Sequence, residues 1–211
     1  MTERIVIVGG GTGGSVAANR LAEKLDAEIE SGDVEVTLVT DDPDHVYKPI
    51  YLYVPFGKKT PEDARRPVRE LLDPKVELRI NRVVDIDTDA KRLECQDGHT
   101  TLNYDHLIVA TGAKLVPEEV PGLAEDGHHF YGPQGAAKLR DALADFEEGH
   151  LVLSVVGVPH MCPAAPVEFT LMADEWFRQR GIRDQVEITY TYPIQRIHGL
   201  EPIHEWMEPR F

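Results

Sequence analysis

Near the N-terminus, a run of glycines has the spacing that binds a diphosphate. The segment 9–14 is Gly-Gly-Gly-Thr-Gly-Gly and fits G-x-G-x-x-G, with an apolar run before it and helically spaced apolar residues after it. In such a strand–turn–helix unit, Gly9 allows the tight turn, Gly11 lets the backbone approach a pyrophosphate, and Gly14 lets helix and strand pack closely. The helix N-terminus adds the positive end of its dipole. The pattern therefore predicts a dinucleotide site.

The same fingerprint expects an acidic residue at the end of the second strand, where it binds the ribose hydroxyls. The second strand is predicted over residues 34–39, and Thr40 stands at the expected place, followed by Asp41 and Asp42. Two interpretations stay open for a ribose contact, because Asp41 can shift into the role or Thr40 can bond the ribose more weakly. Asp41 and Asp42 also fit a solvated turn before Pro43.

Cys162 is the second candidate for chemistry. It precedes Pro163, and the apolar spacing predicts a helix over residues 163–179 with the proline in its first position. A sulfur at a helix N-terminus is favoured as thiolate, the nucleophilic form. Glu168, about one and a half turns later, is a candidate proton relay. The alternatives are a buried inert thiol for Cys162 and a carboxylate that only favours the helix start for Glu168.

The loop that contains Cys162 lacks a second glycine fingerprint. A strand is predicted over residues 151–156, and the next six residues are Gly-Val-Pro-His-Met-Cys. A proline and a methionine occupy the place of the phosphate turn, so a pyrophosphate cannot approach the backbone closely there. His160 in this loop is expected to be a surface or hydrogen-bonding group.

These elements predict an α/β chain of two Rossmann-like domains. Residues 1–118 form a nucleotide-binding domain with a small antiparallel meander, built from strands at 76–80, 82–86, 92–95 and 100–102. Residues 119–211 form the start of a second, truncated dinucleotide-fold domain, with a helix over 135–146 and strands at 151–156 and 186–190. We expect the chain to be the N-terminal part of a longer protein.

The composition excludes several classes of protein. The 37 acidic residues exceed the 22 basic ones, giving a net charge of −15, so no nucleic-acid footprint is expected. Acid spread along the whole chain suggests a salt-rich environment that screens the repulsion. No apolar run approaches the roughly 20 residues of a membrane span, and a cytoplasmic location is expected. Two cysteines make no disulfide framework, Cys95 is expected to be a structural thiol, and no metal site is expected.

Three segments together resemble a known group of flavoproteins. They are 107–112 (Leu-Ile-Val-Ala-Thr-Gly), 45–51 (His-Val-Tyr-Lys-Pro-Ile-Tyr) and 160–168 (His-Met-Cys-Pro-Ala-Ala-Pro-Val-Glu). With the glycine turn, the chain resembles the sulfide:quinone oxidoreductase and flavocytochrome c sulfide dehydrogenase group. This resemblance implies FAD as the cofactor and Cys162 at the redox position. It also implies the residues around FAD: Gly9, Gly11 and Gly14 on the pyrophosphate, Pro49 near the isoalloxazine, and Thr111 and Gly112 beside the cofactor.

The activity implied by the resemblance passes electrons from sulfide through the Cys162 thiolate and FAD to a quinone. A missing C-terminal half would carry the second redox cysteine and any peripheral contact with the inner face of the cell membrane. The chain departs from the three-cysteine members, because no cysteine lies between Gly112 and the second domain. Two alternatives stay open: an NAD(P)H- or ferredoxin-linked flavin reductase, or a truncated, non-catalytic flavoprotein fragment.

Overall fold

The computed structural model describes residues 2–210, which divide into two compact units. The first unit comprises the chain up to Lys48 together with Glu62–Lys114, and the second comprises Pro49–Pro61 together with the chain from Leu115 onward. The sequence predicts a boundary after residue 118, with residues 49–61 in the first domain. In the structure, Leu52 and Phe56 of this segment are buried in the core of the second unit, because their apolar side chains pack on helices that come much later in the chain.

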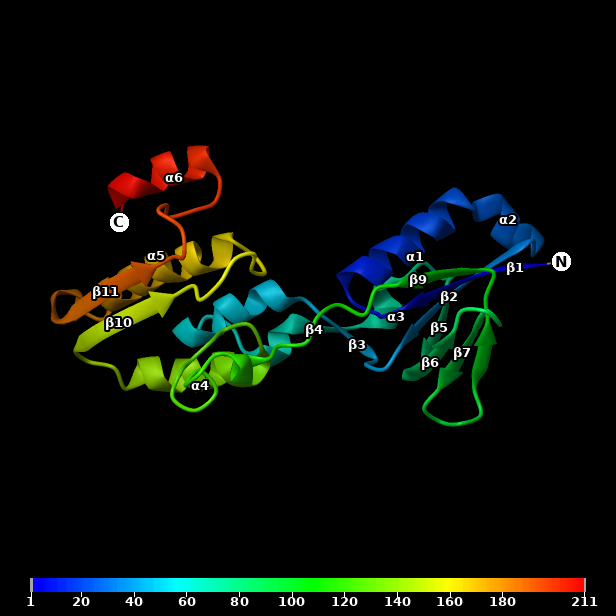
Figure 1. The fold of residues 1–211 in the computed structure, drawn as a ribbon, viewed down its shortest axis with the longest axis horizontal. Coiled ribbons are helices and arrows are strands. Elements are labelled where there is room, and N and C mark those ends of the chain that lie inside the picture. The colour runs from blue at the N-terminus through cyan, green and yellow to red at the C-terminus, as the bar shows by residue number, and fades with distance from the viewer. Residues whose placement is uncertain (1, 211) are drawn as a thin grey trace. The chain divides into compact units, whose positions relative to one another are not determined.

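A four-stranded parallel sheet forms the centre of the first unit, in the order β5-β2-β1-β9 (Figure 1). Its strands are β1 (Glu3–Val8), β2 (Val34–Thr40), β5 (Glu77–Ile80) and β9 (His106–Val109). The helices of this unit are α1 (Thr12–Lys24), α2 (Asp26–Ser31) and α3 (Val68–Leu71). The helix α1 connects β1 to the parallel strand β2, which is the βαβ unit that the glycine pattern predicts.

Alternation along β1 builds two separate cores. Ile5 and Ile7 pack with α1 residues in one apolar cluster, whereas Val6 and Val8 belong to a second cluster that includes Leu93 of the meander. Side chains of a strand point alternately to opposite faces, so helices cover one face of the sheet and the meander covers the other. The four apolar residues of β1 are thus all buried.

The meander contains three strands, β6 (Val83–Asp87), β7 (Arg92–Cys95) and β8 (Thr101–Asn103), paired antiparallel. The expectation of a fourth meander strand at 76–80 was wrong, because β5 pairs in parallel with β2, with Thr37 opposite Glu77. The composition of a short strand favours extended backbone but does not choose its partner. Between β2 and α3 the chain also contains a small antiparallel pair, β3 (Asp44–Val46) and β4 (Arg65–Pro67).

The second unit pairs β10 (Gly149–Ser154) with β11 (Val186–Thr191) in parallel. Its helices are α4 (Pro133–Ala144), α5 (Ala164–Gln179) and α6 (Glu201–Met207) (Figure 1). Short 3-10 helices complete the chain: η1 (Lys48–Leu52), η2 (Val54–Phe56), η3 (Pro61–Ala64), η4 (Pro117–Glu119), η5 (Arg183–Gln185) and η6 (Glu208–Arg210). Aromatic rings hold the core, with Phe169 stacked on Phe130 at 4.9 Å and tilted against Phe56 at 5.2 Å between ring centroids.

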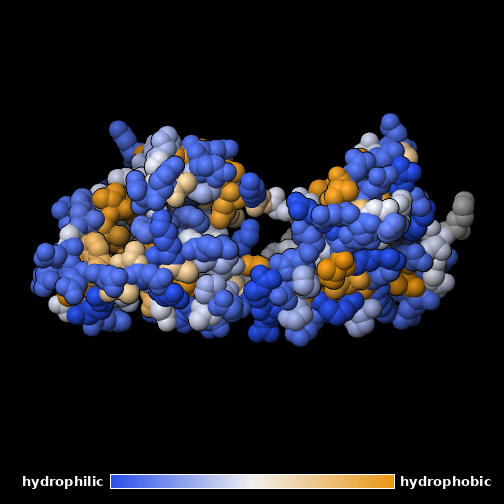
Figure 2. All heavy atoms as spheres, turned by 90° about the horizontal axis from the view of Figure 1, so that it is seen from below, coloured by the Kyte–Doolittle hydropathy of each residue, from blue (hydrophilic) through white to orange (hydrophobic). Residues whose placement is uncertain are grey.

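The outer surface is largely hydrophilic, with scattered apolar patches on the face that Figure 2 shows. Among residues 2–210, no helix combines the length and the apolar character needed to cross a membrane.

Candidate functional site

The glycine turn lies at the carboxyl end of β1 and is closed by two contacts that no side chain could tolerate. A Cβ built on Gly9 would lie 2.3 Å from the carbonyl oxygen of Ala110, and Gly9 has φ +114°, which favours glycine. A Cβ built on Gly14 would lie 1.8 Å from the carbonyl oxygen of Gly9. Both glycines are therefore required by the fold of the turn itself.

Gly11 differs from these two glycines because it is exposed and faces open space. A Cβ built there has no neighbour within 4 Å, and Gly11 is the N-cap of α1, where no side chain caps the helix. No acidic residue lies in the first helical turn, so the first N–H groups of α1 are available to an anion. A bare backbone beside an uncapped helix start fits the diphosphate of a dinucleotide.

At the end of β2, the two candidates for binding the ribose, Thr40 and Asp41, differ in burial and in hydrogen bonding. Thr40 is buried, and its hydroxyl donates to the carbonyl of Asp42 at 3.2 Å. Asp42 is also held by Arg65 at 2.9 Å, which limits its freedom as a ligand. Asp41 is exposed, and among the described residues no hydrogen bond or ion pair holds its carboxylate. Asp41 therefore has the carboxylate that is free to bind a hydroxyl pair.

The end of β9 completes this edge of the sheet. The amide nitrogen of Thr111 would lie 3.1 Å from a Cβ on Gly9, and Thr111 and Gly112 are both exposed directly after the strand. The turn, Asp41 and these two residues thus all follow carboxyl ends of parallel strands, where open α/β sheets bind their ligands. Pro49 is exposed in η1 and groups with the second unit, so its position beside the isoalloxazine stays a prediction.

In the second unit, Cys162 is a free, exposed thiol two residues before the start of α5. Its φ is +58°, in the left-handed region that residues with a side chain rarely adopt. Its carbonyl accepts a hydrogen bond from the N–H of Ala165 at 3.2 Å. The helix begins at Ala164 and not at Pro163, which has helical angles but precedes the first helical residue as its cap. The predicted place of the sulfur at the helix start is unchanged.

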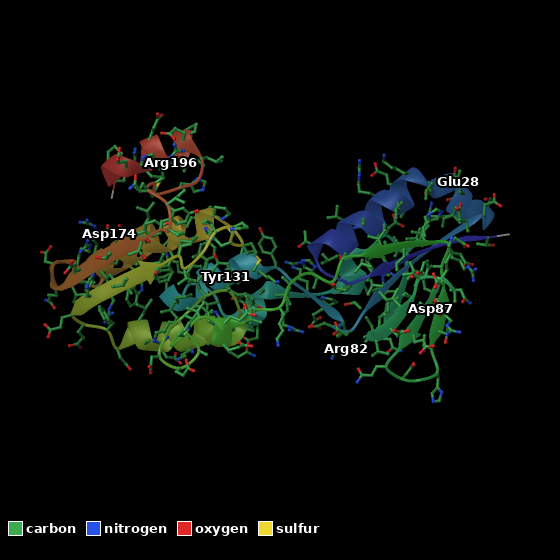
Figure 3. All side chains as sticks on the ribbon, in the orientation of Figure 1. Glu28, Arg82, Asp87, Tyr131, Asp174 and Arg196 are labelled. Carbon is green, nitrogen blue, oxygen red and sulfur yellow. The ribbon has the colours of Figure 1, made fainter. Side chains whose placement is uncertain are left out.

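The hydroxyls of two tyrosines contact the loop that carries Cys162. Tyr131, labelled in Figure 3, donates from its hydroxyl to the carbonyl of Met161 at 2.8 Å. Burial, with a smaller effect of Cys162, raises the pKa of Tyr131 to about 12, so this phenol stays protonated at neutral pH. His160 Nε2 lies 3.3 Å from the hydroxyl of Tyr192, which agrees with the hydrogen-bonding role expected for this histidine.

The remaining candidates have different surroundings. Glu168 is exposed on α5, and within residues 2–210 no hydrogen bond joins it to Cys162, so its role as a proton relay stays a prediction. Cys95 is buried in β7, and burial raises the pKa of its thiol. No cluster of three or more histidine, cysteine or acidic side chains in the described part of the chain is arranged to hold a metal ion.

Sequence reasoning did not single out two residues that contact these sites. His45 bonds to the glycine turn across 35 residues, and Tyr131 bonds to the Cys162 loop across 30 residues. Nothing in the local pattern predicts either contact, although His45 lies within a segment that carries the family resemblance.

Most of the chain is similar to known protein sequences. It is 26% identical to a mitochondrial sulfide:quinone oxidoreductase of Mus musculus, over 93% of this chain and 43% of the relative. It is 29% identical to an NADH dehydrogenase-like protein of Mycobacterium tuberculosis, over 74% of this chain and 38% of the relative. The chain thus spans less than half the length of these relatives.

Its fold is also that of a solved structure, the sulfide:quinone oxidoreductase of Aquifex aeolicus. The TM-score is 0.81 at 24% identity, and the match covers 100% of this chain and 49% of that one. The pyridine nucleotide-disulphide oxidoreductase family matches residues 3–188, which include the glycine turn and the Cys162 loop. The chain therefore belongs to the pyridine nucleotide-disulphide oxidoreductase family, and its cofactor is FAD.

Proposed function

We propose that this chain is part of a flavoprotein that oxidises sulfide at Cys162 and delivers the electrons to a quinone. One observation carries the proposal: the loop between β10 and α5 presents an exposed, free cysteine in the place where the first unit has a bare glycine turn. The two loops occupy equivalent positions, each between a parallel strand and the helix that follows it. Their chemistry is nevertheless different.

The second loop is poorly suited to a nicotinamide dinucleotide. Gly157 is its only glycine, and Pro159 and Met161 place side chains where the first loop offers bare backbone. A proline also lacks an N–H, so it cannot donate to a phosphate. The loop therefore favours an electron donor that reacts with sulfur over a nicotinamide dinucleotide, whose pyrophosphate needs a bare backbone.

Gly9, Gly11 and Gly14 would hold the diphosphate of FAD, and Asp41 would bind its ribose. When bound, FAD would supply the two-electron acceptor for sulfide and the two-electron donor for the quinone. The net reaction is HS⁻ + H⁺ + quinone → S⁰ + quinol, in which sulfide loses two electrons and the quinone gains two electrons and two protons.

Cys162 acts in this proposal as one half of a disulfide with a second thiol, which the resemblance places outside residues 1–211. Hydrosulfide attacks the second sulfur, so the S–S bond to Cys162 breaks as a new S–S bond forms. The products are a persulfide and the Cys162 thiolate. The Cys162 thiolate then bonds to the outer sulfur of the persulfide, which releases one proton and one electron pair, and FAD would accept that pair. The sulfide-derived atom stays as the central sulfur of a trisulfide, at the oxidation level of the S⁰ in the net reaction.

The surroundings of Cys162 support part of this chemistry. Tyr131 keeps its proton to about pH 12, so at neutral pH it is a donor to the Met161 carbonyl and not a base. The exposed carboxylate of Glu168 is the candidate for moving the released proton.

We also propose a cytoplasmic location, with peripheral contact at the inner face of the cell membrane made by parts of the full-length protein outside this chain.

Rapid mixing under anaerobic conditions tests the electron donor. The full-length protein is purified with FAD bound, mixed with sulfide or with NADH, and followed by the loss of flavin absorbance. Bleaching by sulfide and not by NADH is the expected result.

The opposite result would replace the proposal with the second candidate, a nicotinamide-linked flavin reductase. That candidate is favoured by the similarity to an NADH dehydrogenase-like protein. Bleaching by neither reagent would identify the chain as a flavoprotein fragment without this activity.

A further inference from the structure

The carbonyl of Gly10, in the middle of the glycine turn, accepts two hydrogen bonds from buried side chains. Ser15 Oγ donates to it at 3.2 Å from the first turn of α1. His45 Nδ1 lies at the same distance, 3.2 Å, and comes from β3. Ser15 is 6% exposed and His45 9% exposed. A carbonyl oxygen only accepts hydrogen bonds, so Nδ1 of His45 carries the proton.

The two donors leave the Gly10 peptide with little freedom. Both lone-pair directions of the carbonyl oxygen are used, and on the other side a Cβ on Gly10 would lie 2.9 Å from the hydroxyl oxygen of Thr40. Gly10 itself is buried. Gly10, which has no side chain, is thus held in place by the side chains of Ser15, His45 and Thr40.

The orientation of this carbonyl determines the orientation of the next N–H. The Gly10–Gly11 peptide is not among the cis bonds of the described chain, and in a planar trans peptide the C=O and the following N–H point in opposite directions. With the oxygen turned toward His45 and Ser15, the N–H of Gly11 points away from both. Within residues 2–210 this N–H makes no hydrogen bond, and Gly11 borders open space.

His45 is well placed to act as an anchor because its own backbone is fixed. It lies opposite Arg66 in the β3–β4 pair. Beside it, the N–H of Tyr47 donates to the carbonyl of Ala64 at 2.8 Å. Ser15, in contrast, lies only five residues from Gly10, in the helix that the same turn begins. Of the two donors to the Gly10 carbonyl, only His45 comes from an element that does not adjoin the turn.

We propose that His45 is a positioning residue for FAD: it holds the Gly10 carbonyl so that the Gly11 N–H is already oriented toward the diphosphate before the cofactor binds. The contribution is preorganisation, since without the anchor the bare Gly10–Gly11 peptide must be ordered at the moment of binding. The inference depends on the cofactor and not on the electron donor, so a failure of the sulfide reaction leaves it untouched.

Two substitutions at one position separate the hydrogen bond from packing. His45→Leu keeps apolar bulk and removes the donor, whereas His45→Asn places an amide N–H close to the position of Nδ1. The equilibrium dissociation constant of FAD is measured by quenching of flavin fluorescence, and the melting temperature of each cofactor-free protein is recorded beside it. Ser15→Ala serves as the matched control that removes the local donor to the same carbonyl.

We expect His45→Leu to weaken FAD binding about tenfold, His45→Asn to stay within about threefold of the unmodified protein, and Ser15→Ala to have a smaller effect than His45→Leu. Equal FAD affinity in His45→Leu and the unmodified protein would overturn the inference. So would equal losses in the Leu and Asn variants, with or without a lower melting temperature, because the role of His45 would then be packing.

Discussion

Adding one methyl group to Gly14 or to Gly11 should have opposite consequences for the protein. In Gly14→Ala the new Cβ would lie 1.8 Å from the Gly9 carbonyl oxygen, so β1 and α1 must separate by about 1 Å in a close-packed interior. Overpacking of this kind costs about 3 kcal/mol. For a chain of this size, that lowers the melting temperature by roughly 6–12 °C.

Gly11→Ala introduces the same methyl group where the cofactor-free protein has room for it. Gly11 has φ −73° and ψ −174°, an extended conformation that alanine adopts freely, and no atom lies within 4 Å of the new Cβ. The stability of the cofactor-free protein should change by less than about 1 kcal/mol. FAD affinity should fall at least about tenfold, because the methyl group enters the space through which the pyrophosphate approaches.

Thermal unfolding of the cofactor-free variants and titration with FAD measure the two effects separately. Each variant is the control for the other, since the chemical change is identical. If Gly11→Ala bound FAD as tightly as the unmodified protein, the diphosphate would not lie at this turn. If Gly14→Ala unfolded at the unmodified temperature, the close approach of helix and strand would not be a requirement of the fold.

Five further outcomes are expected. Asp41→Asn should weaken FAD binding about tenfold, whereas Asp42→Asn should leave affinity unchanged because Arg65 already holds that carboxylate; equal effects would refute the ribose assignment. Iodoacetamide should modify the exposed Cys162 in the native protein and the buried Cys95 only on unfolding. In the full-length protein, Cys162→Ser should still bind FAD but lose the bleaching of the flavin by sulfide. Cys95→Ser should keep both the bound FAD and the bleaching. The pKa of Tyr131 rises from 10.0 to about 12 on folding, so between these pH values the folded state keeps a proton that the unfolded state has lost. The free energy of unfolding should therefore fall from pH 10 toward pH 12. Urea unfolding should show a shallower fall in Tyr131→Phe. Because the net charge is −15, the melting temperature should rise between low and molar KCl as salt screens repulsion; an unchanged value would count against the salt-rich environment.

The sequence alone determined those features whose causes are local. The glycine spacing after an apolar strand predicted the βαβ unit, because the bare turn, the strand and the helix involve residues within about 30 positions of one another. A proline followed by helical spacing placed Cys162 at the start of α5 for the same reason. The structure has both elements, with the helix starting one residue later than expected.

The tertiary structure decided which distant segments meet. Before it pairs, a short strand such as β5 offers backbone N–H and C=O groups that the edge of any other strand can bind. Only the assembled sheet therefore shows that the partner of β5 is β2. Residues 49–61 carry apolar side chains without a clear period, and only the packing of Phe56 on Phe169 places them in the second unit. The contacts of His45 with Gly10 and of Tyr131 with Met161 likewise join segments 30 or more residues apart. Such contacts depend on which segments the tertiary fold brings together. The local sequence around a hydrogen-bonding group does not indicate its partner when that partner is distant in the chain.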